Sequence, residues 1–211
     1  MAAERLRNGR RGYRGVKRAF DIVFSTVVLI VLAPVMGLIS LAIRMDGTGG
    51  PVFFRQTRCG KDGKEFQMYK FRSMVPDAEA RLEELRELNE KTGPVFKIKE
   101  DPRVTRVGKF LRKTSLDELP QFVNVLRGDM SVVGPRPALP TEVEAYGERG
   151  SQRLAVPQGL TSYWQVSPDR DSISFEEWVE LDLGYVRDCG VMTDLKLIIK
   201  TVGVVLTAQG N

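Results

Sequence analysis

The chain of 211 residues contains no histidine and only two cysteines, Cys59 and Cys189. The lack of histidine excludes histidine general bases, Ser–His and Cys–His nucleophile pairs and histidine-ligated metals. The cysteines form no CxxC pair, so the sequence indicates neither a zinc site nor a disulfide framework, and both are expected as reduced thiols in a cytosolic compartment. Any acid–base or nucleophilic chemistry therefore falls first to carboxylates, and oxygen ligands would favour a Mg²⁺-like ion.

Nucleotide-binding fingerprints are also missing. The glycine-rich stretch at Gly47-Thr48-Gly49-Gly50 lacks both the Gly-Lys-Ser/Thr ending of a P-loop and the GxGxxG spacing of a dinucleotide site. There are no internal repeats, no low-complexity tract and no composition break that requires a second domain. A chain of this length is expected to hold one domain with a sizeable core, with or without appendages.

Positive charge is concentrated in an N-terminal arm. The net charge is +5, but residues 1–18 contribute +6 and the remainder sums to −1. The arm contains a single acid, Glu4, and seven cations: Arg5, Arg7, Arg10, Arg11, Arg14, Lys17 and Arg18. A nucleic-acid-binding domain more often carries its charge over the folded surface. A basic arm before an apolar run fits an anionic phospholipid membrane instead, at roughly 1 kcal/mol per cation near the surface.

An uncharged run of 22 residues, Ile22–Ile43, follows the arm. As one helix it would reach roughly 33 Å, enough to cross a hydrocarbon core of about 30 Å. A buried helix of a soluble protein is the alternative. Asp21, just before the run, is expected to pair with Lys17 and Arg18 one turn away.

Pro34 divides this run and is predicted to kink the helix. Basic residues flank both ends, and cations resist translocation, so both ends are expected on the cytoplasmic face. The charges thus favour a re-entrant hairpin of Ile22–Ala33 and Pro34–Ile43. A kinked helix that spans the membrane stays open, because membrane helices tolerate proline.

Short strands and a charged helix are predicted next. Arg58–Gly63 has the composition of a hairpin turn, preceded by a short buried strand at Val52-Phe53-Phe54. Phe66–Arg72 alternates apolar and polar residues as a half-exposed strand does, and Lys70 and Arg72 on it are either solvent-facing or phosphate-binding. Residues 77–91 are expected to form a helix with a stripe of Leu82, Leu85 and Leu88 and a Glu87–Lys91 pair.

Two adjacent carboxylates, Asp117 and Glu118, lie in the stretch Thr114–Gln121 around which the chain is organised. The structural interpretation is a helix over Ser115–Arg127, with a Ser115–Glu118 capping box and Asp117 complementing the helix dipole. The functional interpretation rests on the surrounding cations, since carboxylates among cations suit a phosphorylated, metal-bound substrate. These cations are Arg103, Arg106, Arg112 and Lys113 upstream, and Arg136 in the turn Gly134-Pro135-Arg136-Pro137.

The last third is less regular. Pro157–Val166 is expected to be a turn followed by a strand or an aromatic loop, with Trp164 in the core or acting as a stacking platform. From Thr193 a helix places Leu195, Ile199 and Val202, together with Ile198, Val205 and Leu206, on one face. Such a helix could pack on the core or lie in the membrane interface.

Three runs of sequence resemble a known family: GPVFFRQTRCGKDGKEFQMYKFRSM, DPRVTRVGKFLRKTSLDELPQFVNVLRGDMSVVGPRP and PQGLTSYWQV. In this order, after a basic apolar hairpin, they resemble the bacterial sugar transferases, the monotopic polyprenyl-phosphate phosphoglycosyl transferases. The resemblance covers nearly the whole chain from Lys17 onward. The chain looks like the minimal catalytic form of the family, without the multi-spanning N-terminal region of larger relatives.

The resemblance implies a mixed, mainly helical α/β fold: a small globular catalytic domain, an N-terminal re-entrant membrane helix-hairpin and interfacial amphipathic helices. The expected divisions are a basic arm (1–18), a membrane helix broken at Pro34 (19–45) and a cytoplasmic catalytic domain (46–211). The protein would lie at the bacterial inner membrane as a monotopic enzyme. Self-association into a homo-oligomer is compatible with the sequence. Ala33 precedes Pro34 where relatives often have Ser-Pro, which leaves the break less tightly fixed.

The resemblance also implies a reaction, in which a sugar-1-phosphate passes from a UDP-sugar to undecaprenyl phosphate with release of UMP. Asp117 would attack the β-phosphorus to give a covalent aspartyl phosphosugar, which the lipid phosphate then attacks. Glu118 would help to hold Mg²⁺ or to orient the pair, and Arg136 would grip phosphate. The rival hypotheses are a membrane-anchored scaffold, in which the two carboxylates merely cap a helix, and a nucleic-acid binder, which the near-neutral body argues against.

Overall fold

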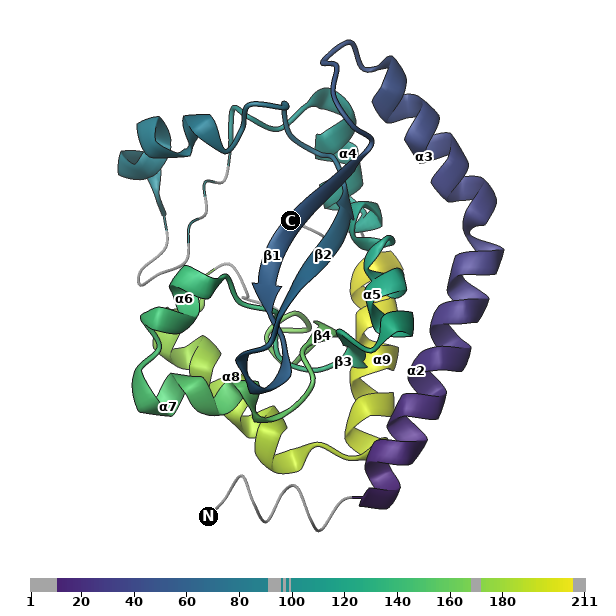
Figure 1. Cartoon of the computed structure of the whole chain (residues 1–211), viewed down its shortest axis with the longest axis vertical. Helices are drawn as coiled ribbons and strands as arrows, with labels where there is room; N and C mark the ends of the chain where they lie inside the picture. Colours follow the sequence, from purple (N-terminus) through teal and green to yellow (C-terminus); the bar gives the residue numbers. More distant parts are fainter. Residues whose placement is uncertain (1–10, 91–95, 97, 99, 168–171, 207–211) are drawn as a thin grey trace.

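The computed structural model describes residues 11–90, 96, 98, 100–167 and 172–206. Within these ranges the fold is mixed α/β and mainly helical, as predicted (Figure 1). The helices are α2 (Arg11–Val31), α3 (Ala33–Met45), α4 (Arg106–Lys113), α5 (Gln121–Arg127), α6 (Pro140–Glu144), α7 (Gly147–Ser151), α8 (Phe175–Asp188) and α9 (Val191–Leu206). The 3-10 segments are η1 (Lys61–Gly63), η2 (Ala80–Leu88), η3 (Leu116–Glu118) and η4 (Gln152–Ala155), and the strands are β1 (Phe53–Cys59), β2 (Glu65–Phe71), β3 (Ser131–Val133) and β4 (Gly159–Thr161).

Helices α2 and α3 form a bent pair along one side of the molecule (Figure 1). No single helix among the described residues is long and apolar enough to cross a membrane. The two helices together have sufficient length and apolar composition, but they meet at an angle of 60°. The break lies at Leu32, and Pro34 occupies the first turn of α3, where its missing N–H is tolerated. The predicted interruption of the helix near Pro34 is therefore confirmed.

The outer faces of this pair and of α9 are apolar and exposed. In α2 and α3 the exposed residues include Val16, Val23, Val27, Ile30, Leu38 and Leu41, and in α9 they are Val191, Met192, Leu195, Ile199 and Val202. The opposite face of α9 packs inward through Leu197, which is buried, and the half-buried Ile198. Helix α9 therefore packs on the core with one face, while its other face is exposed among the residues that the structure describes. Val205 and Leu206, predicted on the apolar face, have side chains outside the described residues.

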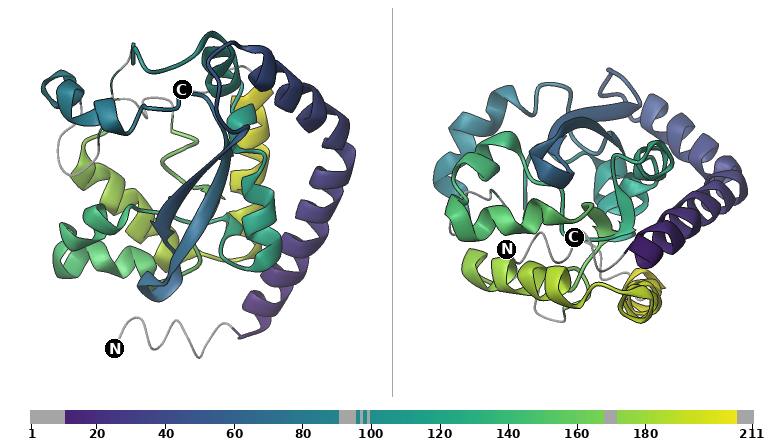
Figure 2. Two further views of the ribbon diagram at one scale, coloured as in Figure 1. Left: turned by 45° about the horizontal axis from the view of Figure 1, so that its top comes forward. Right: turned by 60° about the horizontal axis from the view of Figure 1, so that its bottom comes forward.

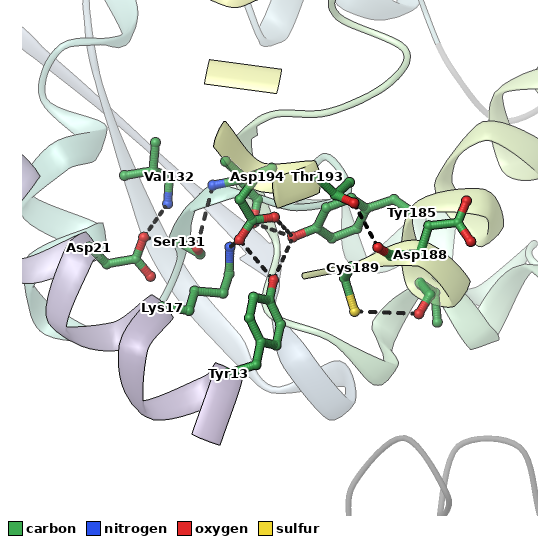
Figure 3. A network of polar contacts seen from close by, with 12 residues as sticks. Tyr13, Lys17, Asp21, Ser131, Val132, Tyr185, Asp188, Cys189, Thr193 and Asp194 are labelled. Atoms are coloured by element: carbon green, nitrogen blue, oxygen red, sulfur yellow. Dashed lines mark hydrogen bonds and ion pairs between the residues drawn. The ribbon is translucent and has the colours of Figure 1, made fainter. Parts of the chain in front are cut away.

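The N-terminal half of α2 is tied to α9 and α8 by a buried polar network (Figure 3). Asp194 of α9 lies at its centre, with Lys17 Nζ and the Tyr13 hydroxyl each 2.8 Å from its Oδ2. The hydroxyl of Tyr185, on α8, donates to Asp194 Oδ1 at 2.9 Å. Figure 2 (right) shows α9 end-on beside the start of α2.

Asp21 does not pair with Lys17 and Arg18, so that prediction was wrong. Its Oδ1 instead accepts hydrogen bonds from the hydroxyl and amide of β3, Ser131 Oγ and Val132 N, each at 3.0 Å. Lys17 turns to Asp194, and Arg18 donates to the last carbonyls of α5. Spacing along one helix could not reveal these partners, because they lie on β3, α9 and α5, which are distant from α2 in the chain.

The predicted hairpin is confirmed, but the expected burial of its first strand is wrong, because Phe53 is exposed and Val52 and Phe54 are only half-buried. Strands β1 and β2 pair antiparallel from Phe53↔Phe71 to Cys59↔Glu65, with η1 at the turn. Strands β3 and β4 pair in parallel, which places the turn after β3 beside the start of β4. Trp164, in the loop after β4, is half-buried and stacks on Trp178 of α8, with the two ring centroids 4.6 Å apart.

The charged helix predicted over residues 77–91 is wrong in type. Ala80–Leu88 forms a 3-10 segment, Leu82 and Leu85 are only half-buried, and Leu88 is exposed. The leucine stripe has too little core to pack on, and an α-helix of this length depends on such packing. The predicted partner of Glu87, Lys91, lies outside the described residues.

Candidate active site

The segment that carries Asp117 and Glu118 is a short 3-10 turn between two helices. Helix α4 ends at Lys113, Ser115 adopts a left-handed conformation with φ 56°, η3 covers Leu116–Glu118, and α5 begins only at Gln121. The single helix predicted over Ser115–Arg127 is therefore wrong. So is the capping box, since the Ser115 side chain makes no capping hydrogen bond. Proline at 120 supplies no amide hydrogen, and a left-handed residue at 115 cannot continue a helix.

Two leucines hold this turn in place. Leu116 and Leu119 pack against a buried cluster of Ile39, Ile43, Phe71 and Leu111. The cluster joins α3 of the bent pair to β2 and α4. Burial of the leucines on either side of the carboxylates fixes where Asp117 and Glu118 lie relative to α3.

Lys70, on β2, reaches the pair directly. Its Nζ donates to Glu118 Oε1 at 2.7 Å, and both side chains are partly exposed. Phe71, the next residue, turns into the core, so the alternation along β2 directs Lys70 to the site. Asn124 of α5 supports this arrangement, because its side-chain amide bonds the backbone of β2 at Tyr69 N (3.0 Å) and Gln67 O (2.7 Å).

The two carboxylates have opposite shifts in pKa. Asp117 is only 7% exposed, and burial raises its pKa to about 6, with the charge of Lys70 acting against the rise and that of Glu118 adding to it. Burial also acts against the charge on Glu118, but the charge and hydrogen bond of Lys70, the charge of Arg136 and a hydrogen bond from Gln121 lower its pKa. Neighbouring carboxylates with divided pKa values are typical of functional sites.

Arg112 and Arg136 act on the pair through their charges, Arg112 on Asp117 and Arg136 on Glu118. Arg112 donates from Nε to Ser73 Oγ at 3.0 Å; burial lowers its pKa, and the charge of Asp117 opposes this. Arg136 lies with Nη1 3.3 Å from Glu142 Oε2 and with its guanidinium 5.3 Å from the Trp178 ring centroid. The structure thus brings Lys70, Arg112 and Arg136 close enough to act on the charges of the two carboxylates, while phosphate binding by these three stays a prediction.

The turn that carries Arg136 is shaped by a close approach between strands. A Cβ on Gly159 would lie 2.0 Å from Gly134 N, and one on Gly134 would lie 2.2 Å from Pro157 O. Only glycine fits at these two positions, and that contact fixes the backbone from which Arg136 projects.

Four other predicted cations lie differently. Arg72 is buried and donates to the carbonyls of Gly49 and Ile43, and Arg103 is buried against Asp101, with Nη2 2.6 Å from Oδ2. Both guanidinium groups are therefore used inside the fold. Arg106 and Lys113 are exposed on α4, and within the described residues no hydrogen bond or ion pair joins them to the carboxylates. Phosphate binding by these four stays a prediction.

Two residues that the sequence did not single out also lie in the site. Arg58, at the end of β1, donates from Nη1 to Pro137 O at 3.0 Å. Glu142, on α6, is buried beside Arg58 and Arg136. Glu142 stands three residues after Leu139, the N-cap of α6, which is a capping position, and this was the only sequence signal available. Arg58 had none beyond its charge.

The pair of carboxylates fits Mg²⁺ only together with a substrate. Within the described parts of the chain, no group of three or more acidic or cysteine side chains is arranged to hold a metal ion. Mg²⁺, however, commonly takes one or two carboxylates and completes its ligands with substrate phosphates and water. The lowered pKa of Glu118 keeps that side chain ionised, as a ligand must be. Asp117 and Glu118 would therefore hold Mg²⁺ jointly with a phosphorylated substrate.

A cavity of about 480 Å³ lies elsewhere, beneath the start of α2. Its lining includes Tyr13, Lys17, Met130, Val156 and Tyr185, and none of the predicted site residues. The buried network of Figure 3 forms part of its wall.

Comparison with known proteins gives one consistent result. The model of the family described as bacterial sugar transferase matches residues 12–208. The chain is 43% identical over 208 residues to an undecaprenyl-phosphate galactose phosphotransferase of Salmonella typhimurium, which covers 95% of this chain and 42% of that protein. It is 43% identical over 196 residues to a UDP-glucose:undecaprenyl-phosphate glucose-1-phosphate transferase of Escherichia coli, covering 90% of this chain and 40% of that protein.

A third relative is closer in length. The exopolysaccharide production protein ExoY of Rhizobium meliloti is 39% identical over 199 residues, which cover 92% of this chain and 87% of ExoY. The chain therefore spans about two fifths of the length of the first two relatives and most of the length of the third.

Proposed function

The chain belongs to the bacterial sugar transferase family, and from that premise we propose that it transfers a sugar-1-phosphate from a UDP-sugar to undecaprenyl phosphate, with release of UMP. The product would serve exopolysaccharide or glycoconjugate assembly. The observation that carries the proposal is the pair of Asp117 and Glu118, with divided pKa values, held among Lys70, Arg112 and Arg136. The names of the relatives support the donor and acceptor classes.

The first step is attack by a carboxylate oxygen of Asp117 on the β-phosphorus of the donor. An oxygen–phosphorus bond forms at Asp117, the bond from the β-phosphorus to the bridging oxygen breaks, and UMP leaves with that oxygen. Lys70 and Arg112 favour the ionised form of Asp117, because both lower its pKa against the effect of burial. A carboxylate nucleophile divides one difficult transfer into two easier ones.

The second step returns the enzyme to its starting state. A phosphate oxygen of the lipid attacks the same phosphorus, the bond to Asp117 breaks, and the carboxylate is regenerated while the sugar diphospholipid leaves. Arg136 would hold phosphate charge in both steps, and Glu118, paired with Lys70, would orient the nucleophile. When bound, Mg²⁺ would neutralise charge on the diphosphate and on the leaving UMP. Phosphoryl transfer depends chiefly on such positioning and neutralisation, which a protein without histidine can supply.

The same proposal places the site at a membrane surface. The apolar outer faces of α2, α3 and α9 would enter the cytoplasmic leaflet of the bacterial inner membrane, and the remainder of residues 46–211 would lie on the cytoplasmic side. Within the basic arm of residues 1–18, the cations other than Lys17 and Arg18 would bind anionic phospholipid, because those two are used inside the fold. Because Leu116 and Leu119 pack on α3, the carboxylates would lie near the headgroups that surround the lipid phosphate.

The deciding experiment uses membranes that contain the protein, undecaprenyl phosphate and a panel of UDP-sugars, with UMP release as the measurement. One donor should give UMP and a lipid-linked sugar phosphate, and Asp117→Asn should abolish both with the fold intact. With donor alone, mass spectrometry should detect a phosphosugar on Asp117. Turnover that persists in both Asp117→Asn and Glu118→Gln would refute the mechanism.

The topology has its own test. Single cysteines introduced within residues 1–18 and 46–211 should react from the same side of sealed vesicles. Labelling from opposite sides would exclude the re-entrant arrangement.

A further inference from the structure

Glu142 is a buried carboxylate beside two arginines. Its side chain is 2% exposed, and its Oε2 lies 3.3 Å from Arg136 Nη1 and 4.0 Å from Arg58 Nη1. The same oxygen accepts the amide hydrogen of Leu139 at 2.8 Å, which caps α6. The three contacts come from β1, from the turn after β3 and from α6, so Glu142 joins parts of the chain that are far apart in sequence.

Capping alone does not account for this carboxylate. A cap needs only an acceptor oxygen, and glutamine supplies one as well as glutamate does. The negative charge has a different use, because Arg58 and Arg136 are like charges in a partly desolvated place. Burial and the charge of Arg136 lower the pKa of Arg58 to about 9, and the charge of Glu142 is the largest influence that opposes them. Without a counter-charge the two guanidinium groups would repel each other.

The arrangement leaves Arg136 accessible. Its side chain is 28% exposed, while that of Arg58 is 9% exposed. Its distance to Glu142, 3.3 Å, is longer than the 2.7–2.9 Å or so of a strong charged hydrogen bond. Arg58 also binds this turn, through its hydrogen bond to Pro137 O. The guanidinium of Arg136 lies over the ring of Trp178. Arg136 is thus oriented by its surroundings and still open to another anion.

We propose that Glu142 is a positioning residue, which holds Arg136 and Arg58 side by side so that Arg136 meets the phosphates of the nucleotide-sugar donor. This inference rests on the proposed function and names a further residue on which donor binding depends. A guanidinium held in place before the substrate arrives loses little conformational freedom on binding. The charge of Glu142, and not its capping bond, is the feature that matters.

The test is Glu142→Gln, which preserves side-chain length and the acceptor for Leu139 N but removes the charge. In the membrane assay with the preferred donor, KM for the donor should rise about tenfold while kcat changes less than about threefold, since loss of uniform binding raises KM. The matched control is Glu177→Gln: Glu177 caps α8 by accepting from Ser174 N at 2.9 Å, and no arginine contact is involved in its pKa shift. This control should leave KM unchanged.

Coupling to Arg136 separates positioning from a structural role. In an Arg136→Ala background, Glu142→Gln should change KM less than about twofold, because the group that it positions is gone. A full tenfold effect in that background, or a lower melting temperature with wild-type KM, would overturn the inference. If Glu142→Gln does not fold, the double variant Arg58→Gln/Glu142→Gln removes both buried charges together. It should fold with a raised KM, and a wild-type KM there would also overturn the inference.

The two proposals fail in different ways. A wild-type protein that makes no lipid-linked product with any donor contradicts the proposed function. An active wild type whose KM is insensitive to Glu142→Gln contradicts only the role of Glu142.

Discussion

Lys70 Nζ donates to Glu118 Oε1 at 2.7 Å, although 48 positions separate the two residues in the chain. This contact contributes to the opposite pKa shifts of the two adjacent carboxylates. Glu118 has the ammonium as its partner and its pKa is lowered, while Asp117 is buried beside it and its pKa is raised to about 6.

The raised pKa of Asp117 predicts an acid limit on the first chemical step. Only the ionised carboxylate is nucleophilic, so adduct formation should be steady above pH 7 and fall about tenfold by pH 5, one unit below the pKa. Single-turnover release of UMP between pH 4.5 and 8 measures this. A rate that does not change down to pH 4.5 would show that Asp117 is not the titrating nucleophile.

Replacing Lys70 with Gln should move that limit to higher pH. The charge of Lys70 lowers the pKa of both carboxylates, so its loss raises both, and the midpoint of the single-turnover profile should rise by about one unit or more. Lys64→Gln is the control, because Lys64 is exposed at the hairpin turn and should leave the midpoint in place. An unmoved midpoint in Lys70→Gln would contradict the electrostatic role.

Asp117→Asn should stabilise the protein at alkaline pH. A carboxyl group whose pKa is raised in the folded state stabilises the fold fully below its unfolded pKa of 3.8, and loses that contribution as the pH rises through about 6. At pH 8 the ionised group costs on the order of 3 kcal/mol, a cost that asparagine avoids. Thermal melts in detergent should show the variant above wild type at pH 8 and the difference shrinking toward pH 4. A difference that is independent of pH would refute the assignment.

Gly108→Ala should destabilise the protein although it lies inside a helix. Alanine normally improves an exposed helix interior by about 1 kcal/mol. Here, however, a Cβ would lie 1.9 Å from Ser73 O, a backbone atom that accepts from Thr105 N. The backbone at Ser73, just after β2, would have to move away from α4, which also disturbs the Arg112–Ser73 contact. Melting temperature and kcat should both fall, while Gly184→Ala in α8, where the added atom meets only a side-chain end at 3.8 Å, should be tolerated.

Lys17→Met should loosen the attachment of α2. Lys17 and Asp194 are both buried, and removal of one partner leaves the other charge unpaired, at a cost of about 3–5 kcal/mol. Arg14→Met, at an exposed position one turn earlier, is the matched control. Melting temperatures of the two variants in the same detergent give the comparison, and equal values would contradict a stabilising role for the pair.

Local chemistry determined several features without a folded structure. The uncharged run and its proline gave the bent pair α2–α3, and the turn residues at Arg58–Gly63 gave the β1–β2 hairpin with the alternation that directs Lys70 outward. The predicted cations indicated the site only in part, because Lys70, Arg112 and Arg136 act on Asp117 and Glu118 whereas, within the described residues, the other four do not contact them. These features follow from helix length, backbone preference and side-chain period, all of which operate over a few residues.

Only the tertiary structure decided the rest. Ser115 could cap a helix by its spacing, yet packing of Leu116 and Leu119 on α3 and β2 draws the chain into a left-handed turn instead. Arg72 and Arg103 were predicted to bind phosphate on the same grounds as Arg112 and Arg136, but their guanidinium groups are used inside the fold. Asp21 has its hydrogen-bond partners on β3 and not on its own helix. Glu142 and Arg58 come together across 84 positions. The sequence by itself determined which charges are present; burial and long-range contacts determined which of them face each other, because side chains distant in the chain compete for the same few partners in space.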